Sequence, residues 1–382
     1  MTRALLFSCL ALALVTSACQ DQKTEPTAPA AGVELKQASL PKLNRNHLRL
    51  PAKVRVSDLQ LGEAARRAIN PGDYVCPPST PLIDWYLGEV NQFIDREPNL
   101  YNILYVNLFA DLVPTYEAFL FETTATPQYF GYRGEFTHVV NKTERDVKRF
   151  WNSPSKDIQV IGFHGTVLQN VDKTAATYEF LFGVDHATAL SIANTVRTAV
   201  LQSQVIDGGN HPLFSFNAFA VQAGSGIPNK VLMGDGVLEG YAAIGFRDVA
   251  PQAVFAHEFG HHIQFANGYF NDPIATSGDA AEQTRYTELM ADAFSAYYLT
   301  HKRGAALNRK RVEQFLRVFF DIGDCAFDNP GHHGTPNQRM AAARFGFSIA
   351  AQAQKQGHIL TSQQFHALFV AAYPNLIAPD AT

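Results

Sequence analysis

Residues 257–261 read His-Glu-Phe-Gly-His and carry the clearest chemical signal in the chain. On an α-helix, positions i and i+4 lie on one face about one turn apart, so His257 and His261 can both direct an imidazole at one metal ion. Glu258 lies beside them, where a carboxylate can take a proton from metal-bound water. The pattern predicts a site for one zinc ion, with His257 and His261 as ligands and Glu258 as the catalytic base.

The helix that must carry this motif is predicted over residues 251–267. It begins with a proline, which suits the first turn of a helix, and Gly268 ends it. The apolar residues Phe255, Phe259 and Ile263 flank the polar ones. The alternative is an exposed helix decorated with solvated polar residues, and it is disfavoured because these apolar neighbours favour burial.

A catalytic zinc ion needs a third protein ligand and an open fourth position. Glu288 is the best candidate for that ligand, and we predict it at the start of the next helix. Asp292, one turn further on, can accept a hydrogen bond from a ligand imidazole. Glu282 is the reserve ligand, and the alternative is that Glu288 and Asp292 belong to a solvated helix face. Small residues in this helix would let it pack closely against the first one: Ala291, Ala293 and Ala296.

A third element spans residues 331–339, Gly-His-His-Gly-Thr-Pro-Asn-Gln-Arg. Its glycines permit a tight loop, and Thr335 before a proline predicts the N-cap of a further helix. Two roles stay open for this loop. In one, His333 is catalytic and donates a hydrogen bond in the transition state; in the other, the loop is structural and Arg339 pairs with an acid. For His262 a surface position and a supporting position beside the metal are both open.

Three stretches, in this order, resemble the bacterial neutral zinc metallopeptidases, a gluzincin-like group within the zincins: residues 256–264, 288–294 and 333–339. The resemblance covers roughly residues 250–347. Ala293 departs from it, because we expect a cysteine after Ala-Asp in that family. The departure leaves the metal site untouched and marks the chain as a distant member.

The resemblance implies that His257, His261 and Glu288 bind zinc and that Glu258 is the general base. It also implies a zincin-like metallopeptidase core with a small sheet and an active-site helix. The function predicted is hydrolysis of amide bonds in proteins or peptides, by Glu258-assisted attack of zinc-bound water on a polarised carbonyl. Residues 230–233 are predicted to form an exposed or edge strand, which could hold an extended peptide by strand addition.

Two other functions compete with this prediction. One is a noncatalytic envelope lipoprotein in which zinc holds two helices together and the N-terminal half binds a partner. The other is a zinc hydrolase that acts on peptidoglycan cross-links. A closed fourth coordination position would favour the first of these, because structural zinc sites leave no room for water.

Local patterns predict an α+β fold whose C-terminal part is mostly helical. Residues 57–128 read as helical. Alternation and β-propensity then predict strands at 129–132, 158–167, 213–219 and 230–233. Helices are predicted at residues 143–151, 174–205, 251–267, 280–301, 309–320, 336–356 and 362–372. We divide the body into an N-terminal α/β region, 57–220, and a zincin-like catalytic region, 221–382.

Composition excludes one class of function. The 382 residues are 46% hydrophobic and 17% charged, which suits a globular protein with a substantial core. The formal net charge of −4 provides no basic field of the kind that nucleic-acid binding needs. We therefore expect no nucleic-acid partner.

The N-terminus is predicted to be a signal peptide, residues 1–19. One basic residue, Arg3, precedes the apolar run 4–15, which is too short for a permanent membrane span. The junction before Cys19 resembles a lipobox, so we predict export and membrane attachment through a lipid on Cys19, with the outer membrane preferred over the inner one. Plain secretion to the periplasm or medium is the alternative. Residues 20–56 are predicted to be a flexible tether.

Cysteine usage agrees with export. Of four cysteines, only Cys76 and Cys325 lie in the folded part. In an oxidising compartment such a pair favours one disulfide between the N-terminal and C-terminal regions. Two unpaired buried thiols are the alternative.

Overall fold

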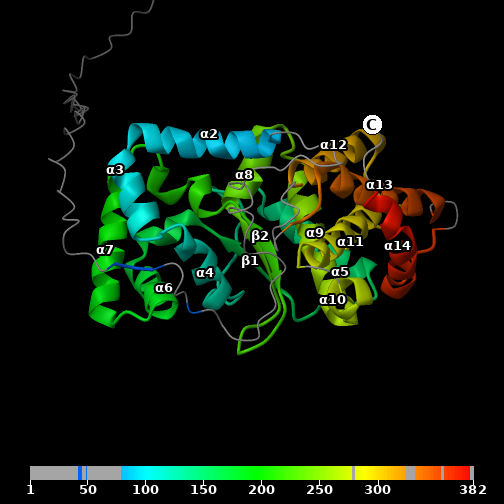
Figure 1. The fold of residues 1–382 in the computed structure, drawn as a ribbon, viewed down its shortest axis with the longest axis horizontal. Coiled ribbons are helices and arrows are strands. Elements are labelled where there is room, and N and C mark those ends of the chain that lie inside the picture. Colours follow the sequence, from blue (N-terminus) through cyan, green and yellow to red (C-terminus); the bar gives the residue numbers. More distant parts are fainter. Residues whose placement is uncertain are drawn as a thin grey trace, which may run out of the picture. The chain divides into compact units, whose positions relative to one another are not determined.

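Helices surround a small three-stranded sheet in this chain (Figure 1). The structure is a computed structural model and describes residues 42–44, 49, 79–277, 280–323, 332–353 and 357–378. Residues from Lys36 to Thr382 belong to one unit. The predicted α+β class is confirmed, with helix far in excess of strand. The predicted signal peptide, the cleavage site at Cys19 and the Cys76–Cys325 pair lie outside the described residues.

The sheet consists of β1 (Gln159–Phe163), β2 (Ala218–Val221) and β3 (Lys230–Gly234), in the order β1-β3-β2. β3 runs parallel to β1 and antiparallel to β2. All of β2 and β3 and four of the five residues of β1 are buried. Apart from Gln159 and Lys230, which start β1 and β3, the three strands contain no polar residue, because strands covered on both faces need no polar alternation.

The prediction of an exposed or edge strand at residues 230–233 is wrong. β3 is the central strand, and its backbone pairs with β1 on one side and β2 on the other, so no peptide can add to it. The glycine-rich context suggested exposure, but a Cβ on Gly234 would collide with the carbonyl oxygens of Ser215 and Asn217. The glycine serves close packing instead.

The predicted strand at residues 129–132 does not form. Gly131 has a left-handed backbone conformation (φ 89°), which a regular strand does not have. At the outer edge of β1, Gly162 N donates to the side-chain oxygen Oε1 of Gln128 at 3.1 Å. The predicted strand at 158–167 ends at Phe163 and gives way to the 3₁₀ helix η4 (Gly165–Gln169). The predicted strand at 213–219 starts with the 3₁₀ helix η6 (Pro212–Phe214), so only its end is extended.

Helices account for most of the described residues before β3. They are α2 (Pro81–Arg96), α3 (Pro98–Tyr101), the π-helix η3 (Asn102–Asn107), α4 (Leu112–Leu120), α5 (Thr137–Phe150), α6 (Val171–Phe182), α7 (His186–Gln202) and the 3₁₀ turn η5 (Asp207–Gly209). The single helix predicted at 174–205 is two helices, because Gly183 adopts a left-handed conformation and Asp185 caps α7 by accepting from Thr188 N.

No single helix among the described residues meets the length and hydropathy needed for a membrane span, although the bent pair 98–107 and 112–120 does.

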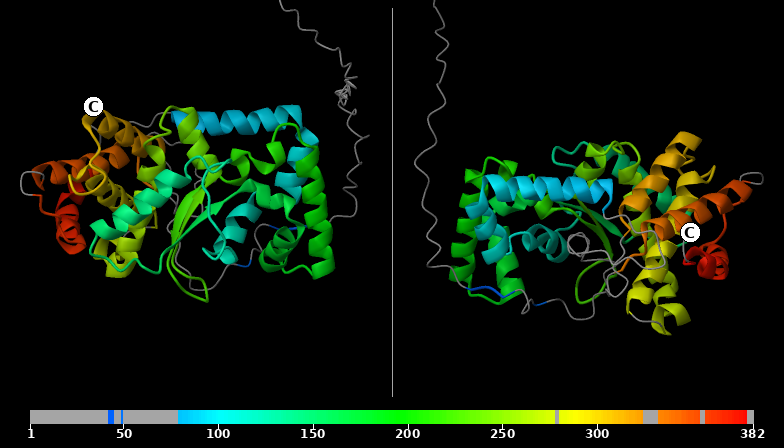
Figure 2. Two further views of the ribbon diagram at one scale, coloured as in Figure 1. Left: turned by 180° about the vertical axis from the view of Figure 1, so that it is seen from behind. Right: turned by 45° about the horizontal axis from the view of Figure 1, so that its top comes forward.

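The five helices predicted after β3 are confirmed to within a few residues as α9, α11, α12, α13 and α14, and three further helical segments of the described residues, α8, η7 and α10, were not predicted. All eight follow β3 in order. They are α8 (Asp235–Ala243), α9 (Ala250–Asn267), η7 (Tyr269–Asn271), α10 (Pro273–Ser277), α11 (Ala280–Thr300), α12 (Arg309–Asp321), α13 (Pro336–Ala353) and α14 (Ser362–Leu376). α11 packs between α9 and α13, and α9 also contacts β2 (Figures 1 and 2). This arrangement places the His-Glu-Phe-Gly-His helix between the sheet and the C-terminal helices.

α9 and α11 approach each other unusually closely. A Cβ on Gly260 would lie 3.0 Å from Cα and 3.1 Å from the carbonyl oxygen of Ala291. The prediction that small residues in α11 allow close packing is thus confirmed at Ala291. The close approach matters because side chains from both helices must reach one point.

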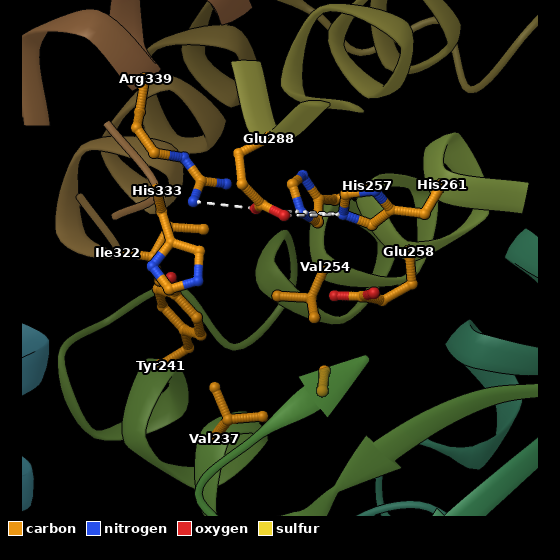
Figure 3. Close-up of a pocket in the computed structure, with 11 residues that line it drawn as sticks. Val237, Tyr241, Val254, His257, Glu258, His261, Glu288, Ile322, His333 and Arg339 are labelled. Carbon is orange, nitrogen blue, oxygen red and sulfur yellow. Dashed lines mark hydrogen bonds and ion pairs between the residues drawn. The ribbon is translucent and has the colours of Figure 1, made fainter. Parts of the chain in front are cut away.

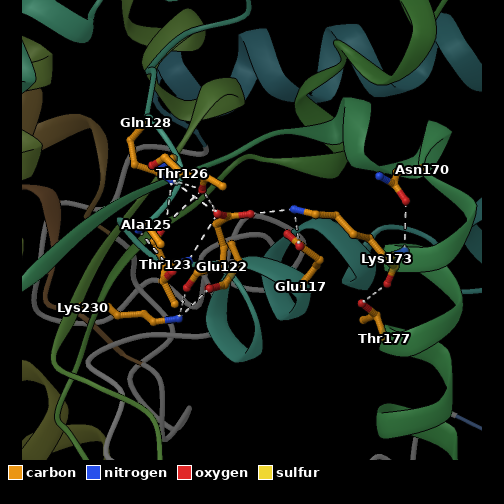
Figure 4. A network of polar contacts seen from close by, with 12 residues as sticks. Glu117, Glu122, Thr123, Ala125, Thr126, Gln128, Asn170, Lys173, Thr177 and Lys230 are labelled. Atoms are coloured by element: carbon orange, nitrogen blue, oxygen red, sulfur yellow. Dashed lines mark hydrogen bonds and ion pairs between the residues drawn. The ribbon is translucent and has the colours of Figure 1, made fainter.

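Two buried polar side chains attach helices to β3, Lys230 for α4 and His262 for α9. The ammonium of Lys230 in β3 donates to the carbonyl oxygens of Ala118, Phe119 and Glu122, at 3.0, 2.9 and 2.7 Å, and so caps the C-terminal end of α4 (Figure 4). Burial lowers the pKa of Lys230 to about 8 despite nearby glutamates. His262 of α9 donates from Nε2 to the carbonyl oxygen of Lys230 at 2.8 Å. Of the two positions left open for His262, the surface one is therefore excluded.

Candidate metal centre

His257 and His261 of α9 and Glu288 of α11 converge in one buried cluster (Figure 3). The two Nε2 atoms lie 3.2 Å apart. Glu288 places Oε2 at 3.2 Å from Nε2 of His257 and Oε1 at 3.2 Å from Nε2 of His261. Each of the three residues is at most 5% exposed. The three side chains predicted as metal ligands are thus brought together, and they form a group that could bind a metal ion.

The spacing of these donor atoms fits a zinc ion. In tetrahedral coordination with zinc–ligand distances of about 2.0–2.1 Å, ligand atoms are separated by about 3.3 Å. The separation of 3.2 Å between the two Nε2 atoms is close to that value, and each Nε2 also lies 3.2 Å from one of the two oxygens of Glu288. Two imidazoles and a carboxylate are also a donor set that zinc accepts, although other divalent ions accept it as well.

Each imidazole is oriented by a second residue, so that Nε2 faces the ion site. Nδ1 of His257 lies 2.8 Å from Oδ1 of Asp292, one turn beyond Glu288 in α11. Nδ1 of His261 lies 2.9 Å from Oε1 of Gln264, whose amide nitrogen donates to the carbonyl oxygen of Thr287 at 2.6 Å. Because the amide nitrogen is committed to that carbonyl, the oxygen faces His261 and its Nδ1 must be the donor.

Arg339 links the two carboxylates of α11. Its Nε and Nη2 donate to Asp292 at 2.6 and 2.7 Å, and its Nη1 lies 3.4 Å from Oε2 of Glu288. The sequence left a structural role for the loop open, with Arg339 paired to an acid, and this pairing is present. Thr335 caps α13 as predicted: its Oγ1 accepts from Gln338 N at 3.1 Å, and its own N–H donates to Gln338 Oε1 at 3.0 Å. The cap fixes the helix turn from which Arg339 projects.

The charges of the cluster favour a divalent cation. Glu258, Glu288 and Asp292 are buried acids, and Arg339 is the buried base among them. Three negative charges and one positive charge leave a net charge of −2, and burying an uncompensated charge is costly. A divalent ion would bring the cluster to neutrality.

In the absence of an ion, a proton bound to His257 compensates part of the negative charge of the cluster. Burial disfavours the charged form of His257, but Asp292 and Glu288 outweigh burial and raise its pKa to about 9. Burial likewise works against ionisation of Glu288, but the charges and hydrogen bonds of His261 and His257 hold its pKa well below the usual range. For Arg339, too, burial is outweighed, and Asp292 raises its pKa. The ligands are therefore arranged for a positive charge between them.

Glu258 and His333 line the same small cavity as the ligands, of about 30 Å³ (Figure 3). Val237 and Tyr241 of α8 and Ile322 after α12 form apolar parts of its wall. A cavity of this size holds about two water-sized groups at most. The site thus has room for an ion and a small ligand of that ion, but none for a peptide.

Three details differ from the sequence-based expectations. Glu288 lies in the middle of α11, about two turns from its start, because that helix begins at Ala280. Glu282 is not part of the ion cluster, because it contacts Arg285 and accepts a hydrogen bond from Tyr373 at 2.6 Å. Gln264 was missed, although its position three residues after His261 places it on the same helix face.

Comparison of the chain with protein-family models, with curated proteins and with solved structures found no match.

Proposed function

We propose that this protein is a zinc-dependent hydrolase of the metallopeptidase type with a zincin-like core, a distant member of the gluzincin-like group that its motifs resemble. The observation that carries the proposal is the triangle of three donor groups, the imidazoles of His257 and His261 and the carboxylate of Glu288, in which the nearest donor atoms of each pair lie 3.2 Å apart. Glu258 lines the same cavity and provides a carboxylate that can act as a base. A purely structural ion site does not need such a base.

Zinc held by the three side chains would supply Lewis-acid polarisation of a substrate carbonyl and would acidify water. Glu258 accepts the proton of the attacking water and passes it to the leaving nitrogen of the amide. Asp292 and Gln264 hold the two ligand imidazoles in the tautomer that directs Nε2 at the ion. His333 lines the cavity and is proposed to donate a hydrogen bond to the developing oxyanion.

The substrates we propose are proteins or peptides in the bacterial envelope. The cavity of about 30 Å³ admits no peptide, so catalysis requires its apolar wall to move. Val237 and Tyr241 of α8, Val254 of α9 and Ile322 are apolar residues of that wall. Closure of this kind is common in enzymes that keep bulk water from the reacting atoms.

Metal analysis and proteomic cleavage profiling of the full chain test the proposal together. The wild type is expected to hold about one zinc per chain, and Glu258→Gln to hold as much while losing cleavage by a factor of about 10² or more. Glu313→Gln is the control, because it makes the same substitution at an exposed glutamate of α12. Cross-linked muropeptides in the substrate panel separate peptidoglycan cleavage from protein cleavage. Full activity in Glu258→Gln contradicts the assignment.

A second candidate is a noncatalytic envelope protein in which zinc holds α9 and α11 together. The small size of the cavity favours it, because structural zinc sites are closed. Cobalt substitution distinguishes the two candidates. Under the hydrolase proposal, acetohydroxamate changes the visible spectrum of the cobalt protein by entering the coordination sphere; an unchanged spectrum supports the structural role.

We also propose that the protein is exported and anchored, with the outer membrane as the preferred site, through a lipid on Cys19. The support is the sequence pattern around Ala18 and Cys19. In cells labelled with a fatty-acid analogue, the wild type is expected to incorporate label and to fractionate with membranes. Cys19→Ala should lose both properties, and a labelled Cys19→Ala protein would refute the anchor.

A further inference from the structure

A second polar cavity lies along β1, an edge strand of the sheet, and its lining includes Phe163 and His164 at the carboxyl end of that strand. Phe163 and Gly234 are paired as the last residues of the parallel strands β1 and β3. The next residue in each case is a titratable one, His164 after β1 and Asp235 after β3. The cavity next to them measures about 340 Å³. Ligands of sheets with parallel strands bind at this end, where the side chains that follow the strands converge.

His164 is held rigidly. Its Nδ1 lies 2.7 Å from Oδ2 of Asp235, whose Oδ1 accepts from Gly131 N at 2.8 Å. The ring of Tyr129 stacks on it with centroids 3.8 Å apart and planes 4° from parallel. Asp235 is 1% exposed, so it covers the Nδ1 edge of the ring. The opposite edge, which carries Nε2, lies beside Gly162 and the cavity.

Nε2 of His164 has no hydrogen-bond partner among the residues that the structure describes. In the neutral ring whose Nδ1–H faces the Asp235 carboxylate, Nε2 is the hydrogen-bond acceptor. A fixed acceptor that faces a cavity of this size is available to a hydrogen-bond donor from outside the chain.

A similar cluster elsewhere serves as an internal comparison. His366 lies 2.7 Å from Asp272 and stacks on Tyr269 with centroids 3.7 Å apart. The exposed fractions of the two histidine side chains are nearly equal, 16% for His164 and 17% for His366. His366 is not among the residues that line the cavity. A stacked histidine with a carboxylate is therefore a motif that this fold also uses away from the cavity, and the cavity is what distinguishes His164.

The charges around the cavity indicate the sign of its ligand. The ammonium of Lys173 is shared between Glu117 at 2.8 Å and Glu122 at 2.6 Å (Figure 4). The ammonium of Lys230 donates hydrogen bonds to three backbone carbonyl oxygens, including that of Glu122. Of the residues that line the cavity, the two carboxylates Glu117 and Glu122 and the one ammonium group of Lys173 leave a net charge of −1. A positively charged ligand completes that balance.

We propose that this cavity binds a small organic molecule that carries a protonated amine, with an amine N–H donating to Nε2 of His164. The cavity volume suits a molecule of about ten heavy atoms or fewer. Asn170 also lines the cavity and offers its amide NH₂ group to the polar remainder of the ligand, while its Oδ1 accepts from Lys173 N. The proposal is independent of the metal centre and of the activity proposed for it.

Nitrogen NMR of the full chain with ¹⁵N-labelled histidine rings tests the proposal. The probes are ammonium, 1,4-diaminobutane and lysine amide, with 1,4-butanediol and tetramethylammonium as matched molecules that lack the charge or the N–H. At least one amine is expected to shift the His164 Nε2 signal saturably and to bind about tenfold tighter than the diol, because hydrogen bonds from a charged donor are stronger. His366 and the exposed His186, which pairs with Glu179 at 2.6 Å, are expected to stay unchanged.

Two charge variants sharpen the test. Lys173→Met removes a positive charge from the cavity wall and is expected to tighten amine binding a few-fold. Lys142→Met removes an exposed lysine from an i,i+4 pair with Asp146 and should leave binding unchanged. The proposal is overturned if no amine shifts His164, if His366 moves in parallel, if the diol or tetramethylammonium binds as well as the amines, or if Lys173→Met weakens amine binding.

Discussion

The metal centre and the His164 cavity both contain a histidine held by a buried aspartate, yet they are built for different occupants. His257 lies 2.8 Å from Asp292, and His164 lies 2.7 Å from Asp235. Around His257 the remaining space is about 30 Å³ and three donor atoms converge on one point. Around His164 the space is about 340 Å³ and a single ring nitrogen faces it.

The difference shows that a histidine–carboxylate pair does not define a function by itself. What matters is the number of donors that converge and the space left for a ligand. Three converging donors with little space suit an ion, whose binding energy comes from short contacts on several sides. One fixed acceptor beside a large polar space suits a molecule that brings its own donors. Changes at one site should therefore leave the other intact.

The largest expected effect is the loss of zinc in His257→Ala. Removing one of three ligands should weaken zinc binding by more than the ~10–100-fold that the hydrogen-bond partners of ligands contribute. Metal content by mass spectrometry and the zinc-dependent shift in melting temperature are the measurements. His164→Ala is the matched control and should keep about one zinc per chain. Equal zinc loss in both variants would break the distinction between the two regions.

The next effect is a pH dependence confined to the metal-free protein. The pKa of His257 rises from 6.5 to about 9 on folding. This stabilisation is fully present below pH 6.5 and is lost as the pH rises through 9, a change of about 3 kcal/mol at 1.36 kcal/mol per pKa unit. Urea unfolding of the metal-free protein at pH 6.5 and pH 9 should show it. Zinc takes the place of the proton, so the stabilisation by zinc should grow over the same interval.

The control for this pH effect is His257→Gln, which has no proton to lose at this position. Its metal-free form should show a smaller decrease in the free energy of unfolding between pH 6.5 and pH 9. If wild type and variant decline equally, another group is responsible, and the charge balance drawn for the metal centre is wrong.

Local sequence patterns were enough to find the ligands. The helices from α9 to α14 follow their periodic patterns and capping residues, and the spacing of His257 and His261 is a property of one helix. Asp292 follows from the same logic, because it lies one turn from Glu288. Gln264 could have been found in the same way, from its i+3 position relative to His261.

Contacts between distant segments were not available from such patterns. Arg339 reaches Asp292 across 47 positions of sequence, and only the packing of α13 on α11 brings them together. The central position of β3 depends on β1, whose Gln159 pairs with Lys230. The same register brings His164, which follows β1, next to Asp235, which follows β3. Because the sequence pattern predicted β3 as an exposed or edge strand, it did not predict this pair or the cavity beside it.

Asp292→Asn should weaken zinc binding by roughly 10–100-fold without abolishing it, because the amide keeps a hydrogen-bond acceptor but loses the charge that orients and polarises the imidazole. Competition with a zinc chelator measures the change. Asp235→Asn makes the same substitution in the His164 cavity and should leave zinc affinity unchanged. An equal loss in both variants would mean that the aspartates act through general stability.

The smallest effect is expected for Gly260→Ala, which tests how far zinc binding depends on the distance between α9 and α11. The new Cβ would meet Ala291 atoms at 3.0 to 3.2 Å, so the helices must separate by a few tenths of an ångström. Overpacking costs about 1 kcal/mol at the low end, and alanine recovers about the same amount through its higher helix propensity. The free energy of unfolding of the metal-free protein should therefore change little, while zinc affinity falls because Glu288 moves away from the two histidines. Unchanged zinc affinity, measured by chelator competition, would show that the ligand side chains adjust to the new helix distance and that the 3.2 Å spacing is not fixed by the backbone.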